Sequence, residues 1–170
     1  MIRLATSADL PLLTALERAA GAPFRDVGMA AIADDTPASP GELAVFQTDG
    51  RCWVYAEHGR PVGYAVAAEV DGFGHVEQVS VLPSHARRGL GRQLIETVDE
   101  WAAARGRPGL TLTTFVEVPW NGPYYERLGF RRLPVEAQGP GLRAIREAEI
   151  ARGLDRWPRA AFVRLRRRRG

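Results

Sequence analysis

The order of strand-like and helix-like segments in the middle of the chain constrains the fold more than any other feature. Three segments rich in β-branched and aromatic residues follow one another across short glycine-containing turns, at 51–57, 61–70 and 75–82, and predict an antiparallel meander. A helical apolar pattern over 89–105 then leads to another strand-like segment at 109–115. Because two strands joined through a helix of this length run parallel, the sequence predicts a mixed, mostly antiparallel sheet with one parallel crossover.

The remaining segments predict helices that flank this sheet and further strands at its ends. Ser39, Pro40 and Glu42 form the pattern of a helix start, with Ser39 as the N-cap. The other expected elements are strands at 2–6, 130–137 and 159–167, helices at 7–21 and 141–153, a weaker helix within 22–35 and a short helical segment at 121–129. A chain of 170 residues without repeats or an obvious linker fits one α/β domain over 1–170.

Composition places the chain among ordinary globular proteins, with 45% hydrophobic and 25% charged residues. No apolar run approaches the ~20 residues that span a bilayer, and the first residues lack a signal-peptide pattern, so a cytoplasmic location without membrane contact is expected. The single cysteine, Cys52, lies in a predicted strand and is interpreted as a buried, reduced thiol. All 23 basic residues are arginines, and they gather near 87–92, near 127–132 and in the tail 164–170.

The junction between strand 75–82 and helix 89–105 has the features of an anion site. The first amides of a helix lack intrahelical partners, and the helix dipole adds partial positive charge there. Gly89 and Gly91 leave room for an anion to approach these amides, while Arg87, Arg88 and Arg92 add charge. The alternative is a tight turn whose arginines only aid solubility. Neither a P-loop nor a Rossmann fingerprint fits the pattern.

The chain resembles the GNAT superfamily of N-acetyltransferases in two blocks. The block "VSVLPSHARRGLGRQLI" at 79–95 is similar to the acetyl-CoA loop of that family, and "PYYERLGF" at 123–130 is similar to its terminal tyrosine element. The resemblance implies a GNAT-like fold with a cofactor-binding core at about 75–133. It also implies that acetyl-CoA is the cosubstrate, that no metal is needed, and that acetyl passes directly to an amine of a small molecule, peptide or protein.

The resemblance also assigns residues to the cofactor. The backbone of Val79, Ser80 and Val81 would pair with the pantetheine arm like an extra strand, although a plain core strand explains the same residues. The amides of the loop would hold the pyrophosphate, and this set comprises Arg87, Arg88, Gly89, Leu90, Gly91 and Arg92. Asn121 would contact the cofactor, or it would only cap the short helix that follows it.

Proton transfer is the second task that the resemblance implies. Tyr125, four residues before Gly129, would be the general acid that protonates the CoA thiolate. Glu77 is the first choice to accept the proton of the amine and His75 the second, because strand alternation places both on one face unless a bulge intervenes. Glu117 is the third choice. A solvated strand charge is the alternative reading for Glu77.

The amine itself cannot be read from the sequence. Phe24 and Trp120 could stack on an apolar or aromatic amine, Arg25 could hold a carboxylate, and Glu117 lies in the same loop as Trp120, but loop packing explains all four residues equally. Two rival functions stay open. One is a basic module that binds nucleic acid or the ribosome through the tail 164–170, and the other is a pseudoenzyme that binds acetyl-CoA without turnover. A homodimer paired through the closing strand is a further expectation.

Overall fold

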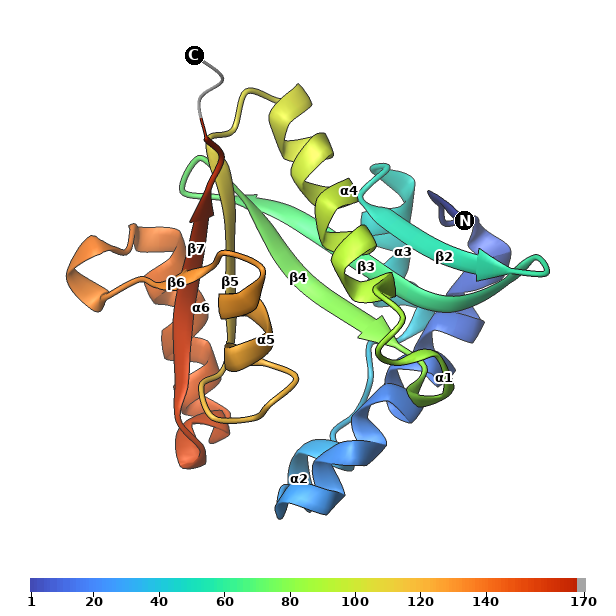
Figure 1. The fold of residues 1–170 in the computed structure, drawn as a ribbon, viewed down its shortest axis with the longest axis horizontal. Coiled ribbons are helices and arrows are strands. Elements are labelled where there is room, and N and C mark those ends of the chain that lie inside the picture. The colour runs from blue at the N-terminus through green and yellow to red at the C-terminus, as the bar shows by residue number, and fades with distance from the viewer. Residues whose placement is uncertain (168–170) are drawn as a thin grey trace. The chain divides into compact units, whose positions relative to one another are not determined.

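A computed structural model describes residues 1–167, and their strands form one sheet in the order β1-β2-β3-β4-β5-β7-β6 (Figure 1). Strands β4 and β5 pair in parallel, with Gly74 opposite Leu110 and His75 opposite Thr111. The pairs β1–β2, β2–β3, β5–β7 and β6–β7 are antiparallel. The predicted mixed sheet with one parallel crossover is therefore confirmed.

The chain divides into two compact units. The N-terminal unit comprises 1–68 and 76–98, and the C-terminal unit comprises 69–75 and the chain from 99 onward. Strand β4 (Phe73–Val81) and helix α4 (Leu90–Ala104) contribute residues to both units. The proposed cofactor segments belong to the first unit, and the proposed acid Tyr125 belongs to the second.

The N-terminal unit packs helices on strands around one apolar cluster. Its elements, besides parts of β4 and α4, are β1 (Ile2–Leu4), α1 (Leu10–Gly21), α2 (Ala30–Ala33), α3 (Pro40–Thr48), β2 (Cys52–Glu57) and most of β3 (Arg60–Val70). Leu13 of α1, Leu43 of α3 and Tyr64 of β3 are buried together in this cluster. The Ser39 hydroxyl accepts a hydrogen bond from Glu42 N at 3.1 Å, so the predicted N-cap is confirmed.

The C-terminal unit is built on the long pairing of β5 with β7. It holds β5 (Gly109–Phe115), α5 (Gly122–Arg127), β6 (Arg131–Arg132), α6 (Pro140–Ala151) and β7 (Arg159–Leu165). Short 3-10 turns occur at Val135–Ala137 and Leu154–Arg156 here, and at Ser7–Asp9, Ala22–Val27 and Pro83–His85 in the other unit. Strand β7 pairs on both sides, with β5 and with the two-residue β6.

Two sequence predictions of elements need correction. The strand expected at 130–137 pairs only over Arg131–Arg132, because Pro134 has no amide to donate and the chain turns into a 3-10 segment after it. The weaker helix expected within 22–35 splits into a 3-10 turn at Ala22–Val27 and the short α2. Gly28, with a φ of 74°, separates the two parts.

Helix α6 is anchored by the turn between β3 and β4. Asp71, in the left-handed region at a φ of 53°, accepts hydrogen bonds from Gly141 N at 2.8 Å and Leu142 N at 2.9 Å. These amides belong to the first turn of α6, where a helix has no backbone partner for them. A residue 70 positions earlier in the chain therefore caps this helix.

Candidate active site

The loop between β4 and α4 presents backbone rather than side chains at the start of the helix. Arg87 and Gly89 both adopt left-handed backbone conformations, with φ values of 61° and 78°. A Cβ at Gly89 would meet nothing within 4 Å, so the space beside this residue is open. The first helical hydrogen bond runs from Gln93 N to Gly89 O at 3.1 Å. The amides before Gln93 in the first turn are consequently available to an anion.

Side chains from the same loop are tied to the end of β2. The carboxylate of Glu57 accepts a hydrogen bond from Arg88 Nη2 at 2.9 Å and contacts His85 Nε2 at 2.9 Å. His85 Nδ1 lies 2.8 Å from the hydroxyl of Ser84. The bond with His85, together with Arg88, lowers the pKa of Glu57. The guanidinium of Arg88 is thus paired, whereas Arg87 extends an exposed side chain.

The second half of β4 carries the backbone segment expected to bind pantetheine. Ser80 is buried, and Val79 and Val81 are half-buried. A Cβ on Gly74 would meet Ala102 of α4 at 2.7 Å, and the side chain of Val81 lies on the face where Leu94 of α4 meets Gly63. Within the N-terminal unit, Val81 and Gly63 therefore lie beside the same helix, α4.

The two proton acceptors that the sequence ranked first occupy different surroundings. Glu77 is exposed, in the N-terminal unit. His75 is 2% exposed, in the C-terminal unit, and its Nδ1 lies 2.8 Å from the hydroxyl of Thr111 on β5. Burial lowers the pKa of His75 to about 4, so this imidazole is neutral near pH 7. An accessible carboxylate suits proton uptake from an amine better than this buried imidazole does.

Tyr125 lies on the short helix α5 within an aromatic row. Its ring centroid is 5.4 Å from Tyr124 and 5.7 Å from Phe130, with edge-to-face geometry in both contacts. The guanidinium of Arg164 lies over the outer ring, Phe130, at 5.1 Å. Burial raises the pKa of Tyr125, so the phenol stays protonated at neutral pH, as a general acid requires.

Asn121 occupies the N-cap position of α5, as predicted, but its side chain does not cap the helix. Its Nδ2 donates to Trp120 O at 3.3 Å, and the backbone carbonyl of Asn121 accepts from Tyr125 N at 2.9 Å. The Oδ1 atom is buried and accepts no hydrogen bond from residues 1–167. Because buried polar atoms rarely lack a partner, this oxygen is available to a donor from a ligand.

The four candidate substrate residues fall into two pairs. Phe24 is half-buried in the 3-10 turn of the N-terminal unit, and Arg25 beside it forms an exposed ion pair with Asp34. Glu117 and Trp120 are exposed in the loop between β5 and α5 of the C-terminal unit, where Trp120 keeps 37% of its surface. Arg25 therefore already has a carboxylate partner within the chain.

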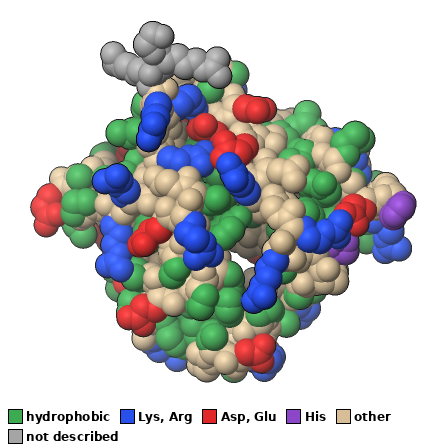
Figure 2. All heavy atoms as spheres, viewed as in Figure 1, with side chains coloured by type: hydrophobic (Ala, Val, Ile, Leu, Met, Phe, Trp, Pro, Cys, Tyr) green, Lys and Arg blue, Asp and Glu red, His purple; other side chains and the backbone are tan. Residues whose placement is uncertain are grey.

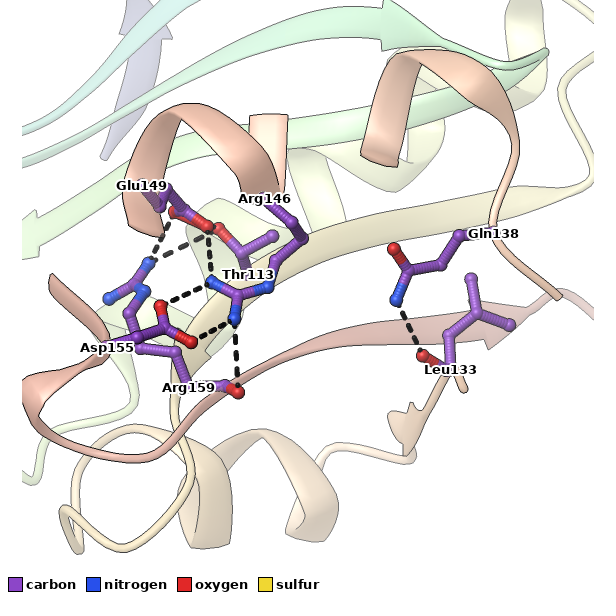
Figure 3. Close-up of polar contacts among 7 residues, drawn as sticks. All are labelled: Thr113, Leu133, Gln138, Arg146, Glu149, Asp155 and Arg159. Atoms are coloured by element: carbon purple, nitrogen blue, oxygen red, sulfur yellow. Dashed lines mark hydrogen bonds and ion pairs between the residues drawn. The ribbon is translucent and has the colours of Figure 1, made fainter. Parts of the chain in front are cut away.

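A charged cluster in the C-terminal unit, in which the side chains of Arg146, Glu149 and Arg159 are largely buried, was not predicted from the sequence (Figure 3). Glu149 of α6 binds Arg146 at 3.0 Å, Arg159 of β7 at 2.8 Å and the Thr113 hydroxyl at 2.7 Å. Asp155 binds Arg146 through both oxygens, at 3.1 and 2.6 Å. These residues are scattered over 47 positions, and only the spacing of Arg146 and Glu149 on one helix face hinted at a pair.

The basic tail is partly neutralised by its own unit. Asp99 pairs with Arg166 at 2.6 Å and with Arg164 at 3.7 Å. Arg166 also donates to the carbonyl of Arg107 at 2.8 Å. Residues 168–170 of the tail lie outside the described residues. On the face shown in Figure 2, arginines are interspersed with acidic and apolar side chains. The ion pairs of Arg164 and Arg166 with Asp99 reduce the net charge of the described part of the tail.

The described part of the chain contains neither a metal-binding cluster nor a helix that could span a membrane. Across 1–167, no three His, Cys, Asp or Glu side chains come together in a way that could hold a metal ion. In the same range, every helix is too short or too polar to cross a membrane.

Comparison with known proteins places the chain among acetyltransferases. Residues 13–130 match the profile described as the acetyltransferase (GNAT) family. The uncharacterized N-acetyltransferase YjcF of Bacillus subtilis (strain 168) is 31% identical over 74 residues, which are 44% of this chain and 51% of that protein. The matched segment thus spans about half the length of this curated relative.

Solved structures with the same fold include several acetyltransferases. The ribosomal-protein-S18-alanine N-acetyltransferase of Escherichia coli has a TM-score of 0.68 and 18% identity, over 100% of this chain and 96% of that one. The PaiA N-acetyltransferase of Thermoplasma acidophilum, in complex with coenzyme A, has a TM-score of 0.73 and 11% identity, over 98% of both chains. The N-acetylglutamate synthase of Neisseria gonorrhoeae, in complex with coenzyme A and N-acetyl-glutamate, reaches 0.73 and 22% over 98% of this chain and 35% of that one.

Proposed function

Because this chain belongs to the acetyltransferase (GNAT) family, we propose that it transfers the acetyl group of acetyl-CoA to an amine. The observation that carries the proposal is the loop at the start of α4. Its left-handed residues Arg87 and Gly89 bring free amides to an open position at the positive end of a helix of 15 residues. The pyrophosphate of acetyl-CoA is the anion that the family would place there.

The cofactor arm would continue from this loop along β4. The backbone of Val79, Ser80 and Val81 would hydrogen-bond the pantetheine amides, and a strand amide would polarise the thioester carbonyl. Asn121 Oδ1, which is buried without a partner among residues 1–167, supports its predicted contact with the cofactor. The guanidinium of Arg88 binds Glu57, so the backbone amide of this residue is the part that remains for the predicted pyrophosphate contact.

The chemistry would proceed without an acyl-enzyme. The nitrogen of the neutral amine attacks the thioester carbon, the new C–N bond forms and the C–S bond breaks. Glu77, the accessible carboxylate, takes one proton from the amine nitrogen, and Tyr125 gives a proton to the departing thiolate. His75 and Glu117 remain the weaker candidates for the first of these transfers.

The acceptor stays open among small amines, amino acids and peptide N-termini. Phe24, Arg25, Glu117 and Trp120 remain predicted substrate contacts, with Arg25 less available because of Asp34. A cytoplasmic location and a homodimer also stay predictions from the sequence. The pseudoenzyme is disfavoured by a protonated Tyr125 and an accessible Glu77 in one chain.

Calorimetry with acetyl-CoA and with CoA tests the cofactor site first. We expect micromolar binding, and we expect Gly89→Val to weaken it at least tenfold, since a branched side chain at this φ disrupts the loop and fills the open position. Gly50→Val is the matched control, because Gly50 has a similar φ of 69° and equally open space but lies outside the loop. An absence of binding at millimolar ligand would mean that the loop is only a turn. It would favour the alternative function, in which the chain binds nucleic acid with an affinity that depends on salt.

Turnover tests the chemistry on a panel of spermidine, tryptamine, L-glutamate and an alanine-initiated peptide, with thiol release as the readout. Tyr125→Phe should lower kcat about a hundredfold and leave acetyl-CoA affinity unchanged. Tyr124→Phe, the neighbouring ring, should keep kcat and serves as the control. An unchanged kcat in Tyr125→Phe would remove this residue as the acid. Binding without turnover of any panel amine would favour the pseudoenzyme.

A further inference from the structure

Three side chains of the N-terminal unit form a chain of hydrogen bonds that the proposed acetyl transfer does not use. The Ser84 hydroxyl lies 2.8 Å from His85 Nδ1, and His85 Nε2 lies 2.9 Å from Glu57 Oε2. All three residues belong to the same compact unit. A hydroxyl, an imidazole and a carboxylate joined in this order are the components of a nucleophilic triad, with the two ring nitrogens in exchanged roles.

Glu57 determines which nitrogen of His85 carries the proton. The hydrogen bond with His85 and the charge of Arg88 lower the pKa of this carboxyl, so Glu57 is ionised at neutral pH and only accepts hydrogen bonds. In the neutral imidazole, Nε2 therefore donates to Glu57, and Nδ1 carries no proton. Nδ1 then accepts from the Ser84 hydroxyl, which is the direction that a general base requires.

The backbone fixes the turn that holds the serine and the histidine. This 3-10 turn, Pro83–His85, is closed by a hydrogen bond from His85 N to Leu82 O at 2.8 Å. Leu82 N in turn donates to Val62 O of β3 at 2.9 Å, which ties the turn to the sheet. Glu57 is the last residue of β2. The nucleophile, the base and the carboxylate are thus all held at the ends of strands.

The exposure of the three side chains fits these roles. Ser84 is exposed, so a substrate can reach its oxygen. The side chains of His85 and Glu57 keep 20% and 26% of their surface, so the bond between them is partly shielded from water. Anchoring of the loop to β2 needs the bonds that Glu57 makes. The bond between Ser84 and His85 joins consecutive residues, and anchoring therefore does not account for it.

We propose that the chain has a second activity, the hydrolysis of small carboxylic esters, with Ser84 as the nucleophile, His85 as the general base and Glu57 as a positioning residue. An ester suits an exposed serine, because its alcohol is a better leaving group than the amine of an amide. The amides proposed to hold pyrophosphate begin at Arg87, after the triad. This second activity goes beyond the proposed function and requires no acetyl-CoA.

The reaction balances with water as the second reactant. The Ser84 oxygen attacks the carbonyl carbon of the ester while its proton passes to His85 Nδ1. The bond between the carbonyl carbon and the alcohol oxygen then breaks, and the alcohol leaves with that proton. Water attacks the acyl-serine and gives a proton to Nδ1, and this proton returns to Ser84 as the acid departs. Glu57 holds the ring and stabilises its positive charge in both steps.

Hydrolysis of 4-nitrophenyl acetate by the full chain, without acetyl-CoA, tests the inference. Release of 4-nitrophenolate should fall about a hundredfold in Ser84→Ala and in His85→Asn, because each change removes a catalytic group. Ser7→Ala is the matched control for the serine, since Ser7 is also exposed in a 3-10 turn. His58→Asn, in an exposed turn, is the control for the histidine. Both controls should keep the wild-type rate.

Glu57→Gln separates positioning from the role of a simple loop anchor. Its kcat for the ester should fall about tenfold with KM unchanged, because an amide cannot stabilise a charged imidazole. An anchor alone would leave this kcat at the wild-type value. The urea midpoint of unfolding, measured in parallel, shows that the variant is folded.

Phenylmethanesulfonyl fluoride gives a second readout that needs no turnover. Its sulfonyl group should be found on Ser84 by peptide mass spectrometry, and Ser84→Ala should remain unlabelled. Hydrolysis at the rate without protein, hydrolysis that persists in Ser84→Ala, or label spread over other serines would overturn the inference and leave the proposed function untouched. Hydrolysis through Ser84 in a chain that does not bind acetyl-CoA would support the inference and contradict the proposed function.

Discussion

Glu57 and Glu149 each bind two basic side chains, but they do so in very different surroundings. Each carboxylate holds two basic side chains, one per oxygen. The two oxygens of Glu57 contact His85 and Arg88 at the surface of the N-terminal unit, where the Arg88 side chain is 52% exposed. Glu149 binds Arg146 and Arg159 inside the C-terminal unit, where all three side chains are only 11–12% exposed.

The difference in exposure determines what each cluster contributes. Water screens an exposed pair, which adds little to stability but can set the conformation of a flexible loop. A buried pair has lost its hydration, so removal of one partner leaves an uncompensated charge inside the protein. The Glu57 cluster therefore affects the conformation of the proposed cofactor loop, and the Glu149 cluster affects the stability of the β5–β7 pair and α6.

Loss of the buried carboxylate should have the largest effect. Glu149→Ala should lower the free energy of unfolding by about 4 kcal/mol, because Arg146 and Arg159 keep their charges without this partner. Urea denaturation measures the change, and Glu147→Ala, an exposed acid on the same helix, is the control. A loss below 1 kcal/mol would mean that burial does not distinguish the two clusters.

The buried side chain of His75 makes the stability of the protein depend on pH. The pKa of His75 is lowered by burial to about 4 from an ordinary value of 6.5. Between these values the unfolded chain binds a proton at His75 and the folded chain does not, so stability falls as the pH drops from 6.5 to 4. The loss should be on the order of 3 kcal/mol. His75→Asn should flatten this part of the stability profile, and His58→Asn, in an exposed turn, should not.

The exposed cluster should show the smallest effect on stability. Glu57→Gln should leave the urea midpoint of unfolding nearly unchanged, because water screens this exposed cluster. Affinity for acetyl-CoA should nevertheless fall about threefold, since Arg88 and His85 lose the anchor that holds the loop to β2. Calorimetry with acetyl-CoA at low and high salt measures the affinity, and urea denaturation measures the stability. An affinity equal to that of wild type would show that the backbone of the loop keeps its shape unaided.

The sequence predicted the parts of the fold that local pattern determines. The Gly-x-Gly junction, the Ser39 cap and the crossover between 75–82 and 109–115 depend on neighbouring residues, and the structure has them. The strand predicted at 130–137 was too long, because Pro134 has no amide to donate and the chain turns into a 3-10 segment after it.

The candidate site was less accessible to sequence reasoning. The sequence placed His75 on a strand, but only tertiary packing shows that it is buried and lies against Thr111 of β5. The buried Oδ1 of Asn121 was also out of reach, because no local pattern reports which of a residue's two polar atoms is already engaged.

The hydrogen bonds from α6 to Asp71 determine when this helix can be anchored during synthesis of the chain. Asp71, in the hairpin turn, is synthesised 70 residues before Gly141, whose backbone amide donates a hydrogen bond to the Asp71 carboxylate. A contact of such sequence separation forms late, because a long loop has to close before it yields any stabilisation. On the ribosome, α6 can only be anchored after its own first turn has left the exit tunnel. The hairpin then acts as a preformed docking point, and the C-terminal third of the chain becomes ordered last.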